Sequence, residues 1–389
     1  MRSFSVAERR ARLACRHFLV GDPTPVSIPD MTSAMVGWHA TDPATPYLSL
    51  WGRIPGFTVA DLDHEIYERR SVVKHLAMRR TLWLVPSRHL AIVQPAASDR
   101  VADNERRRLI ADVEKAGVAK NGARWLERAS KAVRAHLDEH GHASSAELRA
   151  ALPELAGTYD PAPGKRWGGM TPIAPRVLTV LAVSGEMVRG PNTGAWTISR
   201  PRWVATPEWL GSEPVLAESD GARAELLALW LRTFGPATVA DIKWWFGTTL
   251  TAARQALSAV GAVDVDLHGS PGYALPDDLD AEPEPEQWGA LLPGLDVTTM
   301  GWVERSWYLG EHKGQVFDTN GNAGPTAWLN GRIVGGWRQD ADARVQLQLL
   351  EDVGTQGRKV LRQKADELTG WLGGVRINPR FPSPLSKTP

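Results

Sequence analysis

The stretch Thr58-Val59-Ala60-Asp61 has the form of a helix start, a hydroxyl side chain followed three residues later by a carboxylate. In such a capping box each side chain accepts a hydrogen bond from a backbone N–H of the first turn. The pattern recurs at Ser144-Ser145-Ala146-Glu147 and at Thr238-Val239-Ala240-Asp241. Three copies of one signal indicate a repeated supersecondary unit.

The residues around the first copy predict helices followed by a β-hairpin. A proline-rich turn separates the first two of the expected helices, which lie at residues 5–19, 27–38, 45–54 and 58–70. Residues 72–85 are rich in β-branched and apolar side chains, which is typical of two paired strands. Helices followed by a hairpin are the layout of a winged helix-turn-helix unit.

The second and third copies have the same neighbours. A helix precedes each copy, at residues 123–139 and 223–233, and ends at a glycine. A further helix and a hairpin follow, at 173–183 and 186–198 in the second unit and at 250–260 and 262–275 in the third. The sequence therefore predicts an α+β protein with three tandem winged helix-turn-helix units, at residues 1–118, 119–220 and 221–280.

The pattern changes after an acidic, proline-rich linker at residues 277–286. Strands are expected at residues 302–309, 326–329, 332–337 and 344–350, before a closing helix at 357–371. Asn330-Gly331 is a strong signal for a two-residue hairpin turn. Residues 287–389 are therefore expected to form a β-rich domain, a small barrel or a curled sheet.

The composition of the chain excludes several classes of protein and kinds of site. The net charge is +1, with 45 basic and 44 acidic residues, which is not the footprint of a strongly basic nucleic-acid binder. Cys15 is the only cysteine, which excludes an intramolecular disulfide and a thiolate zinc site. No apolar run has the length of a membrane span, and the first residues lack the apolar core of a signal peptide. We expect a cytoplasmic, nucleoid-associated monomer without a metal or cofactor.

Candidate chemistry lies in Gly37-Trp38-His39-Ala40-Thr41-Asp42-Pro43. Pro43 disfavours helix at the preceding residue, so a helix should give way to extended backbone here. In extended backbone His39 and Thr41 share a face, next to the carboxylate of Asp42. Such a set holds one group that titrates near neutrality and two that position water. The alternative interpretation is a helix cap, with Asp42 opening the next turn.

Basic residues gather around the first hairpin. Phosphate contacts are expected from some members of this set, Arg69, Arg70, Lys74, Arg79 and Arg80. Lysine and arginine beside a winged helix position a duplex without reading its sequence. Local ion pairing or a solvated face is the alternative.

Several stretches together resemble one family, the tandem winged-helix proteins that include the bacterial AlkZ and YcaQ DNA glycosylases. The matching stretches are His39-Ala40-Thr41-Asp42-Pro43, residues 77–86, residues 234–241 with Trp244-Trp245, residues 292–296, Asn320-Gly321-Asn322 with Pro325-Thr326, and residues 331–337. The resemblance implies a concave surface around double-stranded DNA. It also implies hydrolysis of the N-glycosidic bond of alkylated purines, in some members at interstrand crosslinks.

Relatives carry Gln-x-Gln or Gln-x-Asp at the catalytic position, where this chain has His39 and Thr41. Trp83 also stands where many relatives have histidine. A neutral His39 would accept the proton of the attacking water, Thr41 would hold that water, and Asp42 would orient the imidazole or face the sugar cation. A carboxylate at Asp42 is expected to raise the pKa of His39 above its ordinary value.

Two functions are therefore weighed. A monofunctional glycosylase predicts His39 and Thr41 exposed at the base of a basic groove. A non-catalytic DNA-binding protein, a regulator or damage-recognition factor, predicts the pair buried or satisfied by hydrogen bonds.

Overall fold

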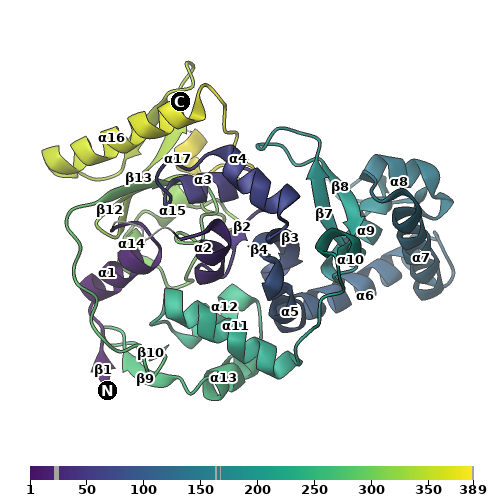
Figure 1. Cartoon of the computed structure of the whole chain (residues 1–389), viewed down its shortest axis with the longest axis horizontal. Helices are drawn as coiled ribbons and strands as arrows, with labels where there is room; N and C mark the ends of the chain where they lie inside the picture. The colour runs from purple at the N-terminus through teal and green to yellow at the C-terminus, as the bar shows by residue number, and fades with distance from the viewer. Residues whose placement is uncertain (22–25, 163, 167, 388–389) are drawn as a thin grey trace.

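A computed structural model describes residues 1–21, 26–162, 164–166 and 168–387 of the chain (Figure 1). The proline-rich turn expected between the first two helices falls at residues 22–25, outside the described residues. Helices and short sheets alternate throughout, which agrees with the α+β class. We keep the predicted ranges as names for the first, second and third units and the C-terminal module.

The first unit has the expected helices and hairpin. Its helices are α1 (Val6–Arg16), α2 (Ile28–Ala34), α3 (Thr45–Trp51) and α4 (Val59–Asp63), which runs into the π-helical turn η1 (His64–Glu68). Its strands are β2 (Trp38–His39), β3 (Val72–Ala77) and β4 (Thr81–Pro86), in the order β2-β4-β3. The turn η2 (Met78–Arg80) joins β3 to β4, and η3 (Ser87–His89), α5 (Leu90–Val93) and η4 (Gln94–Ser98) lead out.

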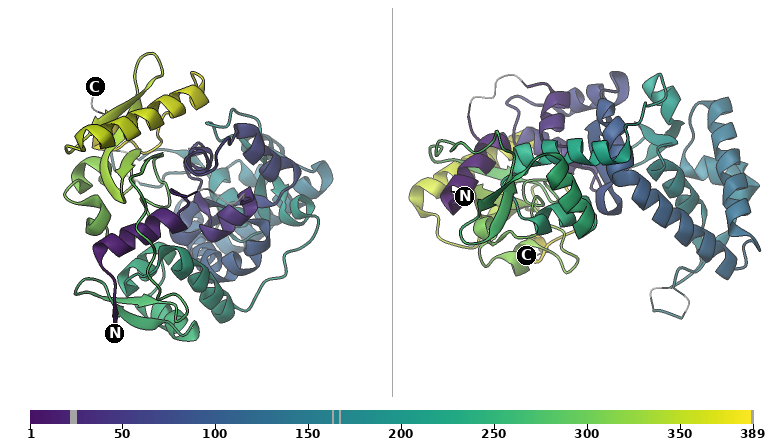
Figure 2. Two further views of the ribbon diagram at one scale, coloured as in Figure 1. Left: turned by 60° about the vertical axis from the view of Figure 1, so that its left-hand side comes forward. Right: turned by 90° about the horizontal axis from the view of Figure 1, so that it is seen from below.

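The second unit stands to one side of the molecule (Figures 1 and 2). Its helices are α7 (Gly122–His140), α8 (Ser145–Ala151), the turn η5 (Pro153–Leu155), α9 (Ala174–Val183) and α10 (Thr206–Leu210). Helix α6 (Asp99–Lys115) falls in the range of the first unit but packs with these helices through Leu109 and Val113. Its strands are β5 (Thr158–Tyr159), β6 (Thr171–Pro172), β7 (Met187–Asn192) and β8 (Pro201–Ala205). A separate cluster of buried side chains, including Leu126 and Leu178, forms its core.

The hairpin of the second unit corrects one expectation, because its second strand begins at Pro201 rather than before residue 198. The connecting segment carries Trp196 away from the hairpin. That ring packs 5.2 Å from Tyr47 and 5.6 Å from Trp371, measured between ring centroids. Contacts with the first unit and the C-terminal module thus hold residues 193–200 as a long loop.

The third unit contains α11 (Ser219–Phe234), α12 (Val239–Phe246), α13 (Leu250–Ala259), β9 (Val263–Asp266) and β10 (Pro271–Ala274). The N-terminal strand β1 (Arg2–Ser3) pairs parallel to β9, so the start of the chain completes this sheet. All three capping boxes expected from the sequence are present, at Thr58, Ser144 and Thr238.

The C-terminal module is an open sheet with the order β11-β12-β13-β14, not a barrel. Its strands are β11 (Gly289–Leu292), β12 (Thr326–Leu329), β13 (Arg332–Gln339) and β14 (Val345–Leu349), and its helices are α14 (Ser306–Leu309), α15 (Lys313–Val316), α16 (Gly354–Leu372) and α17 (Pro384–Lys387). Four strands are too few to close around packed side chains, and α16 covers the sheet instead.

The strand expected at residues 302–309 is wrong. Residues 306–309 form α14, and Trp302, Trp307 and Tyr308 are buried in the central core. Their aromatic character favours strands in general, but here it serves packing between modules. The same cluster of buried side chains takes members from the first unit, the third unit and the C-terminal module, including Trp83, Trp245 and Trp328.

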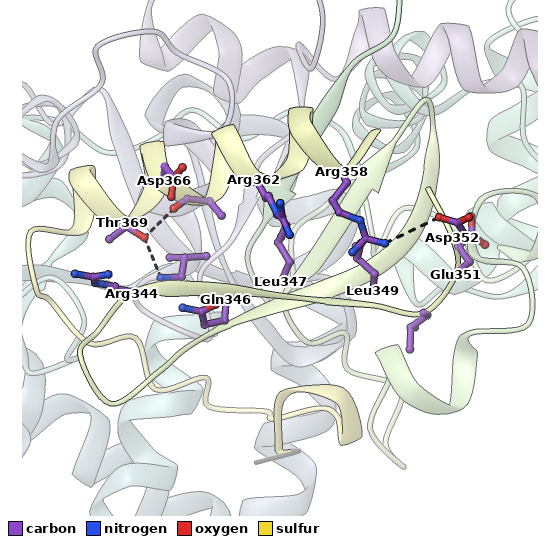
Figure 3. Close-up of a pocket in the computed structure, with 13 residues that line it drawn as sticks. Arg344, Gln346, Leu347, Leu349, Glu351, Asp352, Arg358, Arg362, Asp366 and Thr369 are labelled. Atoms are coloured by element: carbon purple, nitrogen blue, oxygen red, sulfur yellow. Dashed lines mark hydrogen bonds and ion pairs between the residues drawn. The ribbon is translucent and has the colours of Figure 1, made fainter. Parts of the chain in front are cut away.

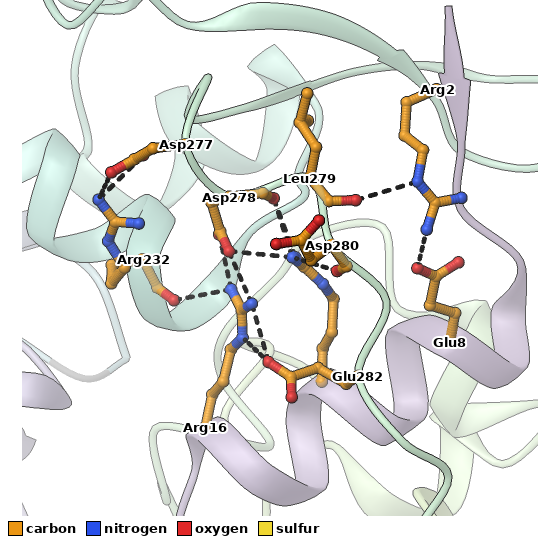
Figure 4. A network of polar contacts seen from close by, with 10 residues as sticks. Arg2, Glu8, Arg16, Arg232, Asp277, Asp278, Leu279, Asp280 and Glu282 are labelled. Atoms are coloured by element: carbon orange, nitrogen blue, oxygen red, sulfur yellow. Dashed lines mark hydrogen bonds and ion pairs between the residues drawn. The ribbon is translucent and has the colours of Figure 1, made fainter.

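Buried and half-buried ion pairs fix these modules to one another. Arg53, just after α3, binds Asp296 of the C-terminal module, and neither side chain is exposed. Arg16 on α1 binds Asp278 and Glu282 (Figure 4). The acidic segment at residues 277–286 is therefore a partner of α1 rather than only a solvated linker.

Candidate active site

The motif around His39 lies on an edge strand of the first sheet. Helix α2 ends at Ala34, earlier than the expected Trp38, because Val36 and Gly37 have positive φ angles of 64° and 150° and turn the chain. A Cβ atom at Gly37 would approach the carbonyl oxygen of Leu84 to 2.9 Å. The glycine therefore lets Trp38 and His39 lie directly against β4.

His39 is buried and electrically neutral. Its side chain is 3% exposed, and its ring centroid lies 5.2 Å from that of Trp83, its partner in the strand register. Burial, with a smaller contribution from the positive charge of Arg79, lowers the pKa of His39 to about 3. The expected increase from Asp42 is wrong, because desolvation is the largest effect and Asp42 does not contribute to it. The buried Nδ1 atom has no hydrogen-bond partner in the described part of the chain.

Thr41 is half-buried and tied to the neighbouring strand. Its Oγ1 atom accepts a hydrogen bond from the backbone N–H of Leu82 at 3.1 Å. A threonine hydroxyl that accepts one bond still has its own hydrogen to donate. No hydrogen bond between His39 and Thr41 is present in the described structure.

Asp42 opens the turn before α3, as the alternative interpretation expected, but the N-cap of that helix is Ala44 and has no side-chain hydrogen bond. Its carboxylate accepts hydrogen bonds from the backbone N–H groups of Ala44, at 3.1 Å, and Arg380, at 2.9 Å. Burial raises its pKa, while these hydrogen bonds act in the opposite direction. Asp42 thus opens the turn before α3 and anchors the C-terminal segment beside Thr41.

Four of the five basic residues proposed for DNA contact form two pairs at opposite ends of the β3–β4 hairpin. Arg69 and Arg70 precede β3 and line a cleft of about 490 Å³ with Trp209. Arg79 and Arg80 form the turn at the other end. The guanidinium of Arg70 lies 4.4 Å from the ring centroid of Trp209, and that of Arg79 lies 4.0 Å from the ring centroid of Trp244.

Four members of the set have polar partners; that of Arg70 is the carbonyl oxygen of Trp209, at 3.0 Å. Arg80 binds Glu105 at 3.0 Å, and Arg69 lies 3.7 Å from Glu65. Lys74 lies between these ends, with its Nζ atom 3.5 Å from the hydroxyl oxygen of Tyr67. Burial lowers the pKa of Lys74 to about 8.

Sequence reasoning missed two arginines near the motif. Arg305, just before α14, stacks against Trp244 and Phe317, and Arg380 reaches the carbonyl oxygen of Thr41 at 3.4 Å. Neither belongs to a basic cluster in the sequence. The only local signal was Trp244-Trp245, a part of the resemblance that marks the element against which Arg305 packs.

A larger cleft, of about 1120 Å³, lies between β14 and α16 (Figure 3). Arg344, Arg358 and Arg362 line it together with Glu351, Asp352 and Asp366. Its lining mixes both charges and includes none of the candidate residues, so it is not the candidate active site.

Neither a metal-binding cluster nor a membrane-spanning helix is present in the described part of the chain. In the described residues, no group of three or more histidine, cysteine, aspartate or glutamate side chains is placed to hold a metal ion. None of the described helices combines the length and apolar character needed to cross a membrane.

Comparison with known proteins relates nearly the whole chain to one family. The family model for AlkZ-like DNA glycosylases matches residues 32–371. The solved structure of the Streptomyces sahachiroi DNA glycosylase AlkZ superimposes with a TM-score of 0.75 at 20% sequence identity, covering 97% of this chain and 99% of that one. At this identity the superposition establishes the fold. No curated protein matches the chain.

Proposed function

The chain belongs to the AlkZ-like DNA glycosylase family, and we propose that it hydrolyses the N-glycosidic bond of alkylated purines in duplex DNA, including bulky or crosslinked lesions. The observation that carries the proposal is the family match over residues 32–371, which spans the His39 motif and the third unit. DNA repair by base excision follows from this activity.

The proposed reaction uses water as the nucleophile. Water attacks the anomeric carbon, the carbon–nitrogen bond breaks, and its electron pair leaves with the purine. An alkylated purine is cationic, so it leaves with little help from an acid. The imidazole of His39 takes the proton of the water, and general-base help of this kind is typically worth about 10²–10⁴-fold.

The local contacts support a division of roles within the motif. Burial keeps His39 neutral, as a proton acceptor must be, but a pKa of about 3 also makes the buried ring a weak base. Thr41 retains a hydroxyl hydrogen for the water while Leu82 holds its oxygen in place. Asp42, bound to Ala44 and Arg380, positions the motif rather than touching the water. Because His39 is 3% exposed, the reaction requires that bound DNA displaces the side chains covering it.

DNA binding without catalysis is the second candidate, and one observation favours it. His39 is buried and the oxygen of Thr41 already accepts a hydrogen bond, as that function predicts. The two candidates differ in product, because only a glycosylase leaves an abasic site.

The test is to incubate the protein with duplexes that carry defined alkylpurines or interstrand crosslinks, and to reveal abasic sites with alkali. Strand breaks at the lesion in alkali support the glycosylase. Tight binding to the same duplexes with no breaks supports the second candidate.

Electrostatic binding to double-stranded DNA by a monomer is part of the proposal, with phosphate contacts from Arg69, Arg70, Lys74, Arg79 and Arg80. An enzyme that acts on scattered lesions cannot depend on a long base sequence. The affinity for undamaged duplex should fall with salt, with a log–log slope of about −0.9 for each neutralised phosphate. A slope near zero, or nanomolar selectivity for one undamaged sequence, contradicts it.

A further inference from the structure

Two arginines that form no ion pair with any described residue meet on one tryptophan where three modules join. The ring of Trp244 on α12 lies 4.0 Å from the guanidinium carbon of Arg79 and 5.1 Å from that of Arg305. Arg79 comes from the hairpin turn of the first unit and Arg305 from the C-terminal module. A third contact, at 4.4 Å, places Arg305 against the ring of Phe317.

In the described structure, neither guanidinium has an ion-pair partner or donates a hydrogen bond. The Nε atom of Arg79 is buried without a partner, and Arg305 is 9% exposed. The buried carboxylate of Asp241 accepts hydrogen bonds from the backbone N–H groups of residues 238, 303 and 304, and in the described structure it forms no ion pair with either guanidinium. Two cations therefore lie close together without the acid that usually accompanies buried charge.

The electrostatic cost falls on Arg79. Burial is the main cause that lowers its pKa, to about 10, and the like charge of Arg305 adds to it. Arg9, a neighbouring arginine over the ring of Trp307, differs because Asp241 and Glu304 partly offset its burial. Cation–π contacts with Trp244 offset part of the cost at Arg79 but supply no negative charge.

The backbone is arranged to keep Arg79 in this place. Arg79 has a φ angle of 56°, which a residue with a side chain rarely adopts. At Gly247, which follows α12, a Cβ atom would lie 2.9 Å from the Cγ atom of Arg79. Glycine at the end of α12 thus leaves room for the stem of Arg79 beside Trp244.

We propose that Arg79 and Arg305, stacked on Trp244, form a binding site for one backbone phosphate of the DNA strand next to the target nucleotide. Arginine binds phosphate through several N–H groups at once, and a phosphodiester supplies the missing negative charge. Arg79 lies in the turn that leads into β4, three residues before Leu82, whose backbone N–H binds Thr41, so a phosphate held here lies at the end of the hairpin that carries the motif. This inference rests on the proposed function, and assigns roles to Arg305 and Trp244 that the sequence did not suggest.

The test measures binding to undamaged duplex over a range of salt concentrations. The variants are Arg79→Met, Arg305→Met and the double variant, with Arg232→Met as a control that removes one charge from an exposed pair with Asp277. We expect the double variant to lose about 0.9 from the log–log salt slope, one phosphate, and about tenfold in affinity near 100 mM salt. Arg79→Lys should retain most of the slope, which separates lost charge from misfolding.

A second measurement identifies the ligand as a phosphate of the DNA. In this experiment, a neutral methylphosphonate replaces one phosphate at a time around an alkylpurine. The affinity of each duplex is measured for the wild-type protein and for the double variant. We expect one position that weakens wild-type binding but leaves the double variant unaffected; a free ion would show no such position. Two outcomes would overturn the phosphate site but not the proposed function. One is an equal salt slope for the double variant and Arg232→Met, and the other is that no methylphosphonate position affects the wild-type protein and the double variant differently. Absence of salt-dependent binding by the wild-type protein overturns the proposed function, and the site with it.

Discussion

Two junctions join the first unit to other modules through arginines, and they differ in what neutralises the charge. Arg53 has a completely buried side chain that binds both oxygens of Asp296, and its other donors reach Ser49 and His17. The guanidinium groups of Arg79 and Arg305 lie against aromatic rings and bind no carboxylate of the described residues. The charge of Arg53 stabilises the fold and is paired with a carboxylate of the same chain. The unpaired charges of Arg79 and Arg305 are available to bind an anion of another molecule.

The contact between α1 and the acidic segment follows the same rule as Arg53. Arg12 is 1% exposed and bound to Asp278, and Arg16 binds Asp278 and Glu282. Net charge therefore says little about where this chain binds DNA, because many of its basic residues are already paired. The distribution of unpaired arginines is more informative.

The largest expected effect is on catalysis beside the unpaired cations. His39→Ala should lower excision of an alkylpurine by about 10²–10⁴-fold, because it removes the proposed base. DNA binding should stay nearly unchanged. His75→Ala is the matched control, since His75 shares the sheet face with His39, is 2% exposed, and has Ser98 as partner. Wild-type excision by His39→Ala would end the catalytic assignment.

At the paired junction, the expected loss is in stability. Arg53→Met leaves Asp296 buried without its partner, which typically costs about 3–5 kcal/mol. The exposed pair of Arg232 and Asp277 is worth about 0–1 kcal/mol, so Arg232→Met is the control. Arg79→Met removes no carboxylate's partner and should resemble the control. Urea unfolding measures the free energy of unfolding of all three variants. A loss for Arg53→Met as small as that for Arg232→Met would contradict the proposed difference between the two junctions.

Local signals in the sequence predicted much of the fold. Each capping box needs only residues three apart, and all three were found. Pairings across long distances were missed: β1 joins β9 from the other end of the first three units, and β2 pairs with β4. The strand expected at residues 302–309 failed because aromatic residues in one short run fit a strand and a core equally well.

In the candidate site, too, local features were predicted from the sequence and long-range contacts were missed. His39, Thr41 and Asp42 were found because they are neighbours in the sequence. Arg305 was not, since only the tertiary structure brings it to Trp244. The pKa of His39 was predicted in the wrong direction because its burial is a tertiary property and outweighs any effect of Asp42.

Acid should weaken the fold while leaving the proposed base competent. Below pH of about 6.5 the unfolded chain protonates His39, but the folded chain does so only near pH 3. Between these two pH values the unfolded state binds more protons than the folded state. The contribution of His39 to the free energy of unfolding is therefore complete above pH of about 6.5 and falls by about 1.4 kcal/mol for each pH unit below that value. Urea unfolding at pH 7 and 5.5 should show a smaller loss for His39→Gln than for the wild type. Excision that declines with a midpoint near 6.5 would instead show that His39 titrates normally.

The smallest expected loss of excision is at Thr41, whose hydroxyl has one structural contact, with Leu82, and one proposed chemical contact, with the water. Thr41→Val removes the acceptor of the Leu82 N–H and the hydroxyl hydrogen proposed for the water, at nearly constant volume. An unsatisfied backbone N–H costs about 1–3 kcal/mol of stability, and we expect about a tenfold loss of excision. Thr41→Ser keeps the hydroxyl and should restore both properties. If Thr41→Val loses stability but excises at the wild-type rate per folded molecule, the hydroxyl only ties β2 to β4, and the chemistry beside the unpaired arginines rests on His39 without it.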